Sequence, residues 1–217
     1  MEPRLKFIAI EGLIGVGKTG LATRLASAWG AEPVLEEVEN NPFLERFYED
    51  LRSYAFQTQL FFLFARHRQQ IALNQRNLFS ERVVSDYLFE KDRIFAFLNL
   101  DEAEIALYEK IYQFLEKDIV RPDLVIYLQA RPEFIWQRIK NEGRLFEREI
   151  SLDYLTALAD AYNRFFFHFD SVPSLLIVNA EHIDPVHNSR DFDGLFKEIV
   201  RGAPGRRYYS PEALWQK

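Results

Sequence analysis

Short apolar segments recur along the chain, each separated from the next by a stretch in which apolar residues have helical spacing. Each segment is about as long as a strand and rich in Val, Ile or Leu, and it lacks the polar alternation of a strand with one solvated face. Five strands are predicted in this way, at Phe7–Glu11, Pro33–Val38, Arg82–Asp86, Leu124–Leu128 and Leu175–Val178. Strands that alternate with helices form parallel sheets covered by helices on both faces. We therefore expect an α/β fold, a three-layer sandwich around a five-stranded parallel sheet.

The stretches between the strands carry signals for helix starts. Asp101 opens an acidic first turn, Pro132 suits the first helical position, and Ser151 has the chemistry of an N-cap. The predicted helices cover Tyr54 to about Leu73, a segment from Asp101, Pro132 to about Lys140, and Ser151 to His168. The last residues are rich in glycine and proline, which predicts irregular backbone. We expect a single domain over residues 1–200 and an irregular tail over residues 201–217.

The turn after the first predicted strand has a sequence typical of phosphate-binding loops. Residues 12–19 read Gly-Leu-Ile-Gly-Val-Gly-Lys-Thr, with two glycines at the required spacing, then Lys and a hydroxyl residue. Glycines let backbone N–H groups turn around an anion, and the following helix N-terminus adds partial positive charge. Lys18 is expected to reach the outer phosphates of ATP, and Thr19 to hold Mg²⁺. The expected ATP-binding residues are Gly12, Gly15, Val16, Gly17, Lys18, Thr19 and Gly20.

Two acidic residues lie at the carboxyl ends of predicted strands, where parallel sheets bind their ligands. Glu36 follows the second strand beside the phosphate loop, a place where it can take the proton of an acceptor hydroxyl. Asp86 ends the third strand and is expected to hold Mg²⁺ through water. The alternatives are a solvated loop carboxylate for Glu36 and a strand-capping aspartate for Asp86.

Basic residues cluster between the fourth and fifth predicted strands. They are Arg138, Lys140, Arg144 and Arg148. Small phosphotransferases close an arginine-rich lid over the phosphoryl group in transfer. We expect a short lid at about residues 138–150, in which Arg138 and Arg144 neutralise the charge of the transition state. The alternative is a charged helix end, where cations also favour the helix dipole.

The composition excludes several functional classes. A net charge of −6 argues against a nucleic-acid-binding surface, and the absence of cysteine excludes disulfides and thiolate metal sites. No apolar run is long enough to span a membrane, and the first residues lack the apolar region of a signal peptide. An Asn-Lys-x-Asp guanine motif is absent, which argues against a switch GTPase. We expect a cytoplasmic protein that binds neither nucleic acid nor membrane.

Further segments fit one family of phosphate-loop enzymes. They are Glu36-Glu37-Val38, Asn41-Pro42-Phe43-Leu44, Tyr54–Gln59 with Arg66, Asp92–Ala96, Arg144–Glu147 and Val178–Asp184. In these segments, over nearly its whole length, the chain resembles the deoxyribonucleoside kinases. The resemblance implies phosphorylation of a deoxyribonucleoside 5′-hydroxyl by ATP with Mg²⁺, in a homodimer. Asn41-Pro42-Phe43 looks most like bacterial purine enzymes, so a purine nucleoside is favoured.

The same resemblance implies roles for individual residues. Glu36 is the general base, Tyr48 and Glu147 hold the 3′-hydroxyl, and a loop with Glu181 and Ile183 lies over the adenine of ATP. The implied base-contacting residues are Gln59, Arg66 and Asp92.

Helix geometry decides between two glutamines as the base-contacting amide. Gln59 is seven residues before Arg66 and shares its helix face, whereas Gln57 lies nearly opposite and is the runner-up. Arg66 and Asp92 have the alternative role of a structural ion pair.

The chain departs from the family at the end of the third strand. The family commonly has an acid followed by Arg and Ser, but this chain has Asp86-Tyr87-Leu88. Either Lys91, Arg93 or a lid arginine takes over the missing charge, or catalysis is slower.

Two other functions remain open. The first is a thymidylate-type monophosphate kinase, which needs a cationic site for the phosphate of its acceptor. Glu36 argues against it, because a carboxylate at that position would repel a phosphate. The second is a nucleotide-binding protein without turnover.

Overall fold

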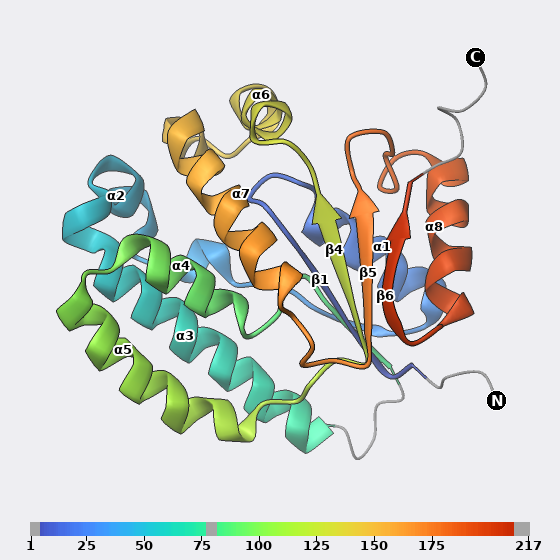
Figure 1. Ribbon diagram of the computed structural model, residues 1–217, viewed down its shortest axis with the longest axis horizontal. Helices are drawn as coiled ribbons and strands as arrows, with labels where there is room; N and C mark the ends of the chain where they lie inside the picture. The colour runs from blue at the N-terminus through green and yellow to red at the C-terminus, as the bar shows by residue number, and fades with distance from the viewer. Residues whose placement is uncertain (1–4, 77–81, 211–217) are drawn as a thin grey trace.

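A six-stranded parallel sheet forms the centre of the fold, in the order β2-β3-β1-β4-β5-β6 (Figure 1). The computed structural model of the chain describes residues 5–76 and 82–210. The strands are β1 (Phe7–Gly12), β2 (Glu32–Val34), β3 (Val83–Ser85), β4 (Leu124–Gln129), β5 (Ser174–Asn179) and β6 (Gly205–Tyr209). Because β1 lies between β3 and β4, the loop that follows β1 is at the middle of the carboxyl edge, where such sheets bind ligands.

Helices lie on both faces of this sheet. They are α1 (Lys18–Trp29), α2 (Leu44–Glu49), α3 (Leu51–Arg76), α4 (Lys91–Asn99), α5 (Glu102–Leu115), α6 (Pro132–Glu142), α7 (Leu152–Phe167) and α8 (Ser189–Arg201), with short 3₁₀ helices η1 (Val38–Asn40), η2 (Glu116–Asp118) and η3 (Phe146–Glu149). Figure 1 shows α7 on one side of the sheet, and α1 and α8 on the other. α8 packs beside α1, with the Arg24 guanidinium 4.3 Å from the centroid of the Phe192 ring.

The apolar side chains form two cores. The larger one surrounds the sheet, where Ile8, Ile10 and Val125 are fully buried, as the continuous apolar strands predict. The second core lies among α2, α3, α4 and α5 and includes the fully buried Leu63 and Tyr108. This second core gives α3 and α4 a rigid base from which polar side chains reach the edge of the sheet.

The predicted helix starts are confirmed. Asp101 forms a capping box with Glu104, and Pro132 is at the first position of α6. Ser151 caps α7 by accepting a hydrogen bond from the backbone N–H of Tyr154. These caps satisfy backbone N–H groups that have no partner within the helix.

The prediction of five strands and an irregular tail was wrong, because β6 lies within the predicted tail and pairs with β5. Gly202 and Gly205 have φ angles of 61° and 87° and form the two ends of the short turn between α8 and β6. After this turn Arg206 donates hydrogen bonds to the backbone oxygens of Phe166 and Phe167, which hold the strand against the end of α7. The rest of the predicted tail, residues 211–217, lies outside the described residues.

The second predicted strand, Pro33–Val38, is also shorter than expected. β2 ends at Val34, and the backbone N–H of Glu36 donates to Oδ1 of Asp86 at 2.7 Å instead of joining the sheet. Residues 38–40 then form a 3₁₀ helix. The carboxylate of Asp86 thus ends the strand and fixes the backbone that carries Glu36.

No helix in the described part of the chain has both the length and the apolar character needed to cross a membrane.

Candidate active site

The phosphate loop joins β1 to α1, and its glycines adopt conformations that other residues rarely adopt. Gly15 and Gly17 have φ angles of 79° and 101°, in the left-handed region that favours glycine. A Cβ at Gly12 would lie 2.5 Å from the backbone oxygen of Leu128 in β4. The loop therefore runs close to the sheet, and α1 begins directly after it at Lys18.

The Lys18 side chain folds back over this loop. Its ammonium donates hydrogen bonds to the backbone oxygens of Gly12 and Leu13, at 2.9 and 3.0 Å. Burial lowers the pKa of Lys18, and the nearby ammonium of Lys91 lowers it further. The cation thus lies beside the N-terminus of α1, an arrangement suited to a polyanionic phosphate.

Asp86, at the end of β3, connects the acceptor side of the site to the phosphate loop. Its Oδ2 accepts a hydrogen bond from the Thr19 hydroxyl at 2.5 Å, and its Oδ1 accepts the backbone N–H of Glu36. Asp86 is 3% exposed. The carboxylate and the hydroxyl therefore form a pair of hard oxygen donors at the first turn of α1.

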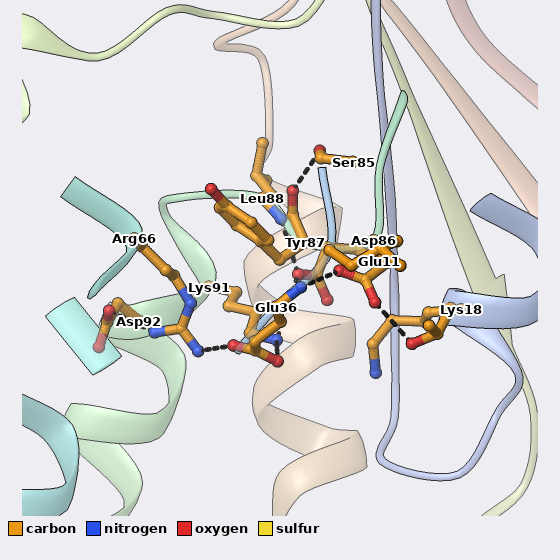
Figure 2. Close-up of polar contacts among 12 residues, drawn as sticks. Glu11, Lys18, Glu36, Arg66, Ser85, Asp86, Tyr87, Leu88, Lys91 and Asp92 are labelled. Carbon is orange, nitrogen blue, oxygen red and sulfur yellow. Dashed lines mark hydrogen bonds and ion pairs between the residues drawn. The ribbon is translucent and has the colours of Figure 1, made fainter. Parts of the chain in front are cut away.

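Glu36 directs its carboxylate at two cations (Figure 2). Its Oε1 accepts a hydrogen bond from Nη2 of Arg66, and its Oε2 lies 2.8 Å from Nζ of Lys91. Burial alone would raise the pKa of Glu36, but Arg66 and Lys91 outweigh burial and hold this pKa well below its usual range. Glu36 is therefore ionised at neutral pH and fixed in orientation by two ion pairs.

Arg66 bridges two carboxylates. Its Nη1 donates to Oδ2 of Asp92, while its Nη2 donates to Glu36. The guanidinium also lies 4.9 Å from the centroid of the Phe62 ring. Arg66 lines the cavity described next, whereas Asp92 is fully buried and does not line it. In the structure Asp92 contacts Arg66, and its contact with the base stays a prediction.

One cavity of about 580 Å³ joins the phosphate loop to Glu36 and Arg66, a volume within the range of small-molecule sites. The predicted residues that line it are Gly15, Gly17, Lys18, Thr19, Gly20, Glu36, Tyr48, Gln59, Arg66, Asp86, Arg138, Arg144 and Glu147. Gly12 and Val16 shape the loop without lining the cavity. Residues from distant parts of the sequence therefore meet around one space.

The two glutamines of α3 face different surroundings. Gln59 is 3% exposed and lines the cavity. Gln57 does not line it, and its amide donates to the backbone oxygen of Ser53 at 2.9 Å. Gln59 thus lies on the cavity side of α3 together with Arg66, as expected from their spacing along the helix.

Tyr48 from α2 and Glu147 from η3 both line the cavity. The Tyr48 ring stacks on Phe146 with centroids 6.0 Å apart. Burial raises the pKa of Tyr48, so its hydroxyl stays protonated and can donate a hydrogen bond. Glu147 accepts the backbone N–H of Arg144 and pairs with its guanidinium at 3.4 Å.

The cations of the predicted lid divide into two kinds. Arg138 and Arg144 line the cavity, and Arg138 donates to the backbone oxygen of Val16 in the phosphate loop at 3.3 Å. Lys140 instead donates to the backbone oxygen of Arg148, and Arg148 donates to that of Gly143. The first pair can reach a ligand, while the second pair holds the backbone of its own segment.

Glu181 and Ile183, predicted to contact adenine, lie outside this cavity. Glu181 forms an ion pair with Arg131 at 2.7 Å, and Ile183 is part of the sheet core. Val186, two residues after this segment, does approach the first turn of α1: its Cγ1 lies 2.9 Å from the position of a Cβ on Gly20.

Phe62, which lines the cavity, and Glu11, which lies behind it, are among the residues of the site that were missed from the sequence. Phe62 is three residues after Gln59 on α3, so its helix face was a usable signal. Glu11, in β1, is fully buried and accepts hydrogen bonds from the Gly12 and Leu88 backbone and from the Tyr162 hydroxyl, each at 2.9 Å. A charged residue at the carboxyl end of an apolar strand was a usable signal for Glu11, but its partners Leu88 and Tyr162 come from distant segments and could not be read from the sequence.

Comparisons with known proteins agree with this geometry. The family model for deoxynucleoside kinases matches residues 8–201. The chain is 36% identical over 201 residues to a deoxyguanosine kinase of Bacillus subtilis, which covers 89% of this chain and 97% of that protein. It is 38% identical over 185 residues to a deoxyadenosine kinase of Dictyostelium discoideum, with 82% of this chain and 74% of that protein covered.

A solved structure has the same fold. The deoxyadenosine kinase from M. mycoides with bound dATP superposes with a TM-score of 0.76 at 28% identity, covering 89% of this chain and 98% of that one. A second structure of that kinase, with the product dCMP and a flexible dCDP bound, gives a TM-score of 0.77. The match of the family model over residues 8–201, together with these relatives, shows that the chain is a kinase and belongs to the deoxynucleoside kinase family.

Proposed function

We propose that this chain transfers the γ-phosphoryl group of ATP to the 5′-hydroxyl of a deoxyribonucleoside, with deoxyadenosine and deoxyguanosine favoured. The observation that carries the proposal is the cavity that joins Lys18 of the phosphate loop to the Glu36–Arg66 pair. A donor phosphate at Lys18 and an acceptor hydroxyl at Glu36 then share one enclosed space, which is the main requirement of phosphoryl transfer.

Thr19 and Asp86 have the chemistry that a Mg²⁺ ion requires. Mg²⁺ prefers hard oxygen donors and keeps several waters, so one hydroxyl and one carboxylate beside the phosphates suffice. The Thr19 hydroxyl and the Asp86 carboxylate already lie 2.5 Å apart. When bound, Mg²⁺ would neutralise charge on the outer phosphates of ATP.

The acceptor side would orient and deprotonate the nucleoside. The 5′-oxygen forms a bond to the γ-phosphorus, the bond from that phosphorus to the bridging oxygen of ADP breaks, and the hydroxyl proton passes to Glu36. Two ion pairs hold the Glu36 carboxylate, so it is oriented before the hydroxyl arrives. Its low pKa makes it a weak base, which suits a loose transition state in which positioning matters more than proton removal.

Arg138 and Arg144 would act as the mobile cations of a short lid at about residues 138–150. Arg138 contacts the phosphate loop, and Arg144 is paired with Glu147. Both would donate hydrogen bonds to the phosphoryl oxygens, where charge spreads during transfer. The loop that carries Glu181 and Ile183 lies outside the cavity, and we still propose that this loop covers the adenine of ATP.

The first prediction concerns base selectivity. Gln59 and Arg66 line the acceptor pocket, with Asp92 fixing Arg66, and buried polar groups discriminate strongly against bases that leave them unpaired. We expect kcat/KM across the four natural deoxynucleosides to be highest for deoxyadenosine and deoxyguanosine and lowest for thymidine. Gln59→Leu should lower kcat/KM for the purines by about tenfold or more, whereas Gln57→Leu should leave it within about threefold. Thymidine as the best substrate, or a larger loss from Gln57→Leu, would overturn the assignment.

The second prediction concerns the sugar. Tyr48 and Glu147 would hold the 3′-hydroxyl, and its removal strands buried polar groups at a cost of about 1–3 kcal/mol each. We therefore expect kcat/KM for a 2′,3′-dideoxynucleoside to be at least about tenfold below that for the 2′-deoxynucleoside. Tyr48→Phe keeps the ring on Phe146 but removes the hydroxyl, so it should narrow this difference. Equal kcat/KM for both substrates in the unmodified chain would contradict the placement.

A further inference from the structure

Lys91 places a buried ammonium between the phosphate loop and the acceptor carboxylate. It is the first residue of α4 and is only 3% exposed. Its Nζ lies 2.8 Å from Oε2 of Glu36 and 4.0 Å from Oε1 of Glu11 (Figure 2). Burying an ammonium is costly unless it is paired, so this position requires the two carboxylates that surround it.

The other side chains near the end of β3 cannot supply this charge. Tyr87 follows Asp86 directly, is fully buried, and has its ring 5.9 Å from the Arg66 guanidinium. Arg93 is used elsewhere, because its guanidinium pairs with both carboxylate oxygens of Glu109, at 2.9 and 3.0 Å. Of the residues considered for the missing arginine, Lys91 is the one that contacts Glu36.

Lys91 has donor capacity that its protein partners do not use. An ammonium carries three N–H donors, and the contact with Glu36 uses one of them. The 4.0 Å separation from Glu11 is too long for a hydrogen bond, and the Glu11 carboxylate already accepts from Gly12, Leu88 and Tyr162. Lys91 also lines the cavity. A donor is therefore available to a group that enters between Glu36 and Lys18.

We propose that Lys91 is the acceptor-side cation of the phosphoryl transfer: it holds the Glu36 carboxylate and donates a hydrogen bond to an oxygen of the phosphoryl group as it reaches the 5′-oxygen. This inference rests on the proposed function. Lys91 donates a hydrogen bond in this step and transfers no proton, and the hydroxyl proton still passes to Glu36. Lys91 thus takes the place of the arginine that the family commonly has after the strand-end acid, but reaches the site from α4 instead of β3.

The test compares Lys91→Met with Arg93→Met, which removes a cation from the same helix outside the cavity. Loss of one preorganised donor to a transition-state oxygen typically lowers kcat by about 10²–10³-fold. We expect that loss for Lys91→Met, with KM for ATP within about fivefold, whereas Arg93→Met should keep kcat within about threefold. Lys91→Gln, which retains a hydrogen-bond donor for Glu36 without the charge, should show the same loss. It serves as the second variant if Lys91→Met does not fold.

The pH profile separates this role from a structural one. The cations that face Glu36 are Arg66 from α3, Lys91 from α4 and Lys18 from α1. The other titratable groups that interact with it are the Asp92 carboxyl from α4 and the hydroxyls of Tyr48, Tyr87 and Tyr162. Burial raises the pKa of Glu36, and the nearby cations lower it. Lys91→Gln removes one of these cations, so the pKa of Glu36 should rise and the acid limb of kcat/KM should move to higher pH. A loss that is equal at every pH and parallels a fall in thermal midpoint would overturn the proposal, as would unchanged kcat. If the unmodified chain phosphorylates no deoxynucleoside, the proposed function is refuted. If the unmodified chain and Lys91→Met transfer phosphate at equal rates, only the role of Lys91 is refuted.

Discussion

Lys18→Ala is expected to abolish nearly all phosphoryl transfer while leaving the fold intact. Among the described residues, the Lys18 ammonium donates its hydrogen bonds to the backbone oxygens of Gly12, the last residue of β1, and Leu13. Both acceptors lie within six residues of Lys18, so its removal breaks only local contacts and leaves no other side chain unpaired. With ATP bound, the same ammonium would face the phosphates, where a lost preorganised cation costs about 10³-fold in kcat.

The measurement for Lys18→Ala is the steady-state rate with ATP, Mg²⁺ and deoxyadenosine, beside the thermal midpoint. Lys6→Ala provides the matched control, because Lys6 is an exposed lysine just before β1 and outside the cavity. We expect an unchanged midpoint for both variants and a normal rate for Lys6→Ala. A Lys18→Ala rate within about tenfold of the unmodified chain would contradict the assigned role.

Glu36→Gln should bind nucleoside but lose turnover by about 10²–10⁴-fold, the usual contribution of a general base. Glutamine keeps the size of the side chain but cannot accept a proton. Its amide also presents N–H groups to Arg66 or Lys91, which are both donors. The carboxylate orientation that two ion pairs fix is therefore lost together with the basicity.

Glu37→Gln is the comparison for Glu36→Gln, since the Glu37 carboxylate accepts from Asn40 at 2.9 Å and makes no contact with Arg66 among the described residues. We expect less than a tenfold loss from it. If Glu36→Gln itself costs less than tenfold, the role moves to Glu37 or Glu39.

The pH dependence of the unmodified enzyme follows from the same ion pairs. A carboxylate whose pKa is depressed stays ionised above that pKa and is protonated only as the pH falls through it. Arg66 and Lys91 hold the pKa of Glu36 well below its usual range. Titration of Glu36 should therefore produce no acid limb in kcat/KM between about pH 5 and 8.

The sequence predicted the parts of the fold that depend on local signals. The buried strands β1, β3, β4 and β5, the phosphate loop and the caps at Asp101, Pro132 and Ser151 follow from neighbouring residues, and all of these are present. β6 was missed because Gly202 and Gly205 mark a turn as readily as an irregular tail. The short β2 depends on Asp86, fifty residues away, which takes the Glu36 N–H.

The site shows the same division. Gln59 and Arg66 could be placed on one helix face because that relation is periodic along α3. The partners of Glu36 depend on α3 and α4 meeting in space, and those of Glu11 depend on β1 meeting Leu88 and Tyr162 of α7, which no short pattern encodes. The homodimer, the Mg²⁺ ion and the cytoplasmic location stay predictions.

The acceptor of the phosphoryl group is the most direct measurement of the proposed function. The purified chain is incubated with [γ-³²P]ATP, Mg²⁺ and, separately, each natural deoxynucleoside and each deoxynucleoside monophosphate, and the labelled products are separated and identified. We expect label in deoxyadenosine and deoxyguanosine 5′-monophosphates, formed in equal amounts with ADP, and none transferred to a monophosphate acceptor. Label transferred to thymidine monophosphate, or released only as inorganic phosphate, would contradict the proposed reaction.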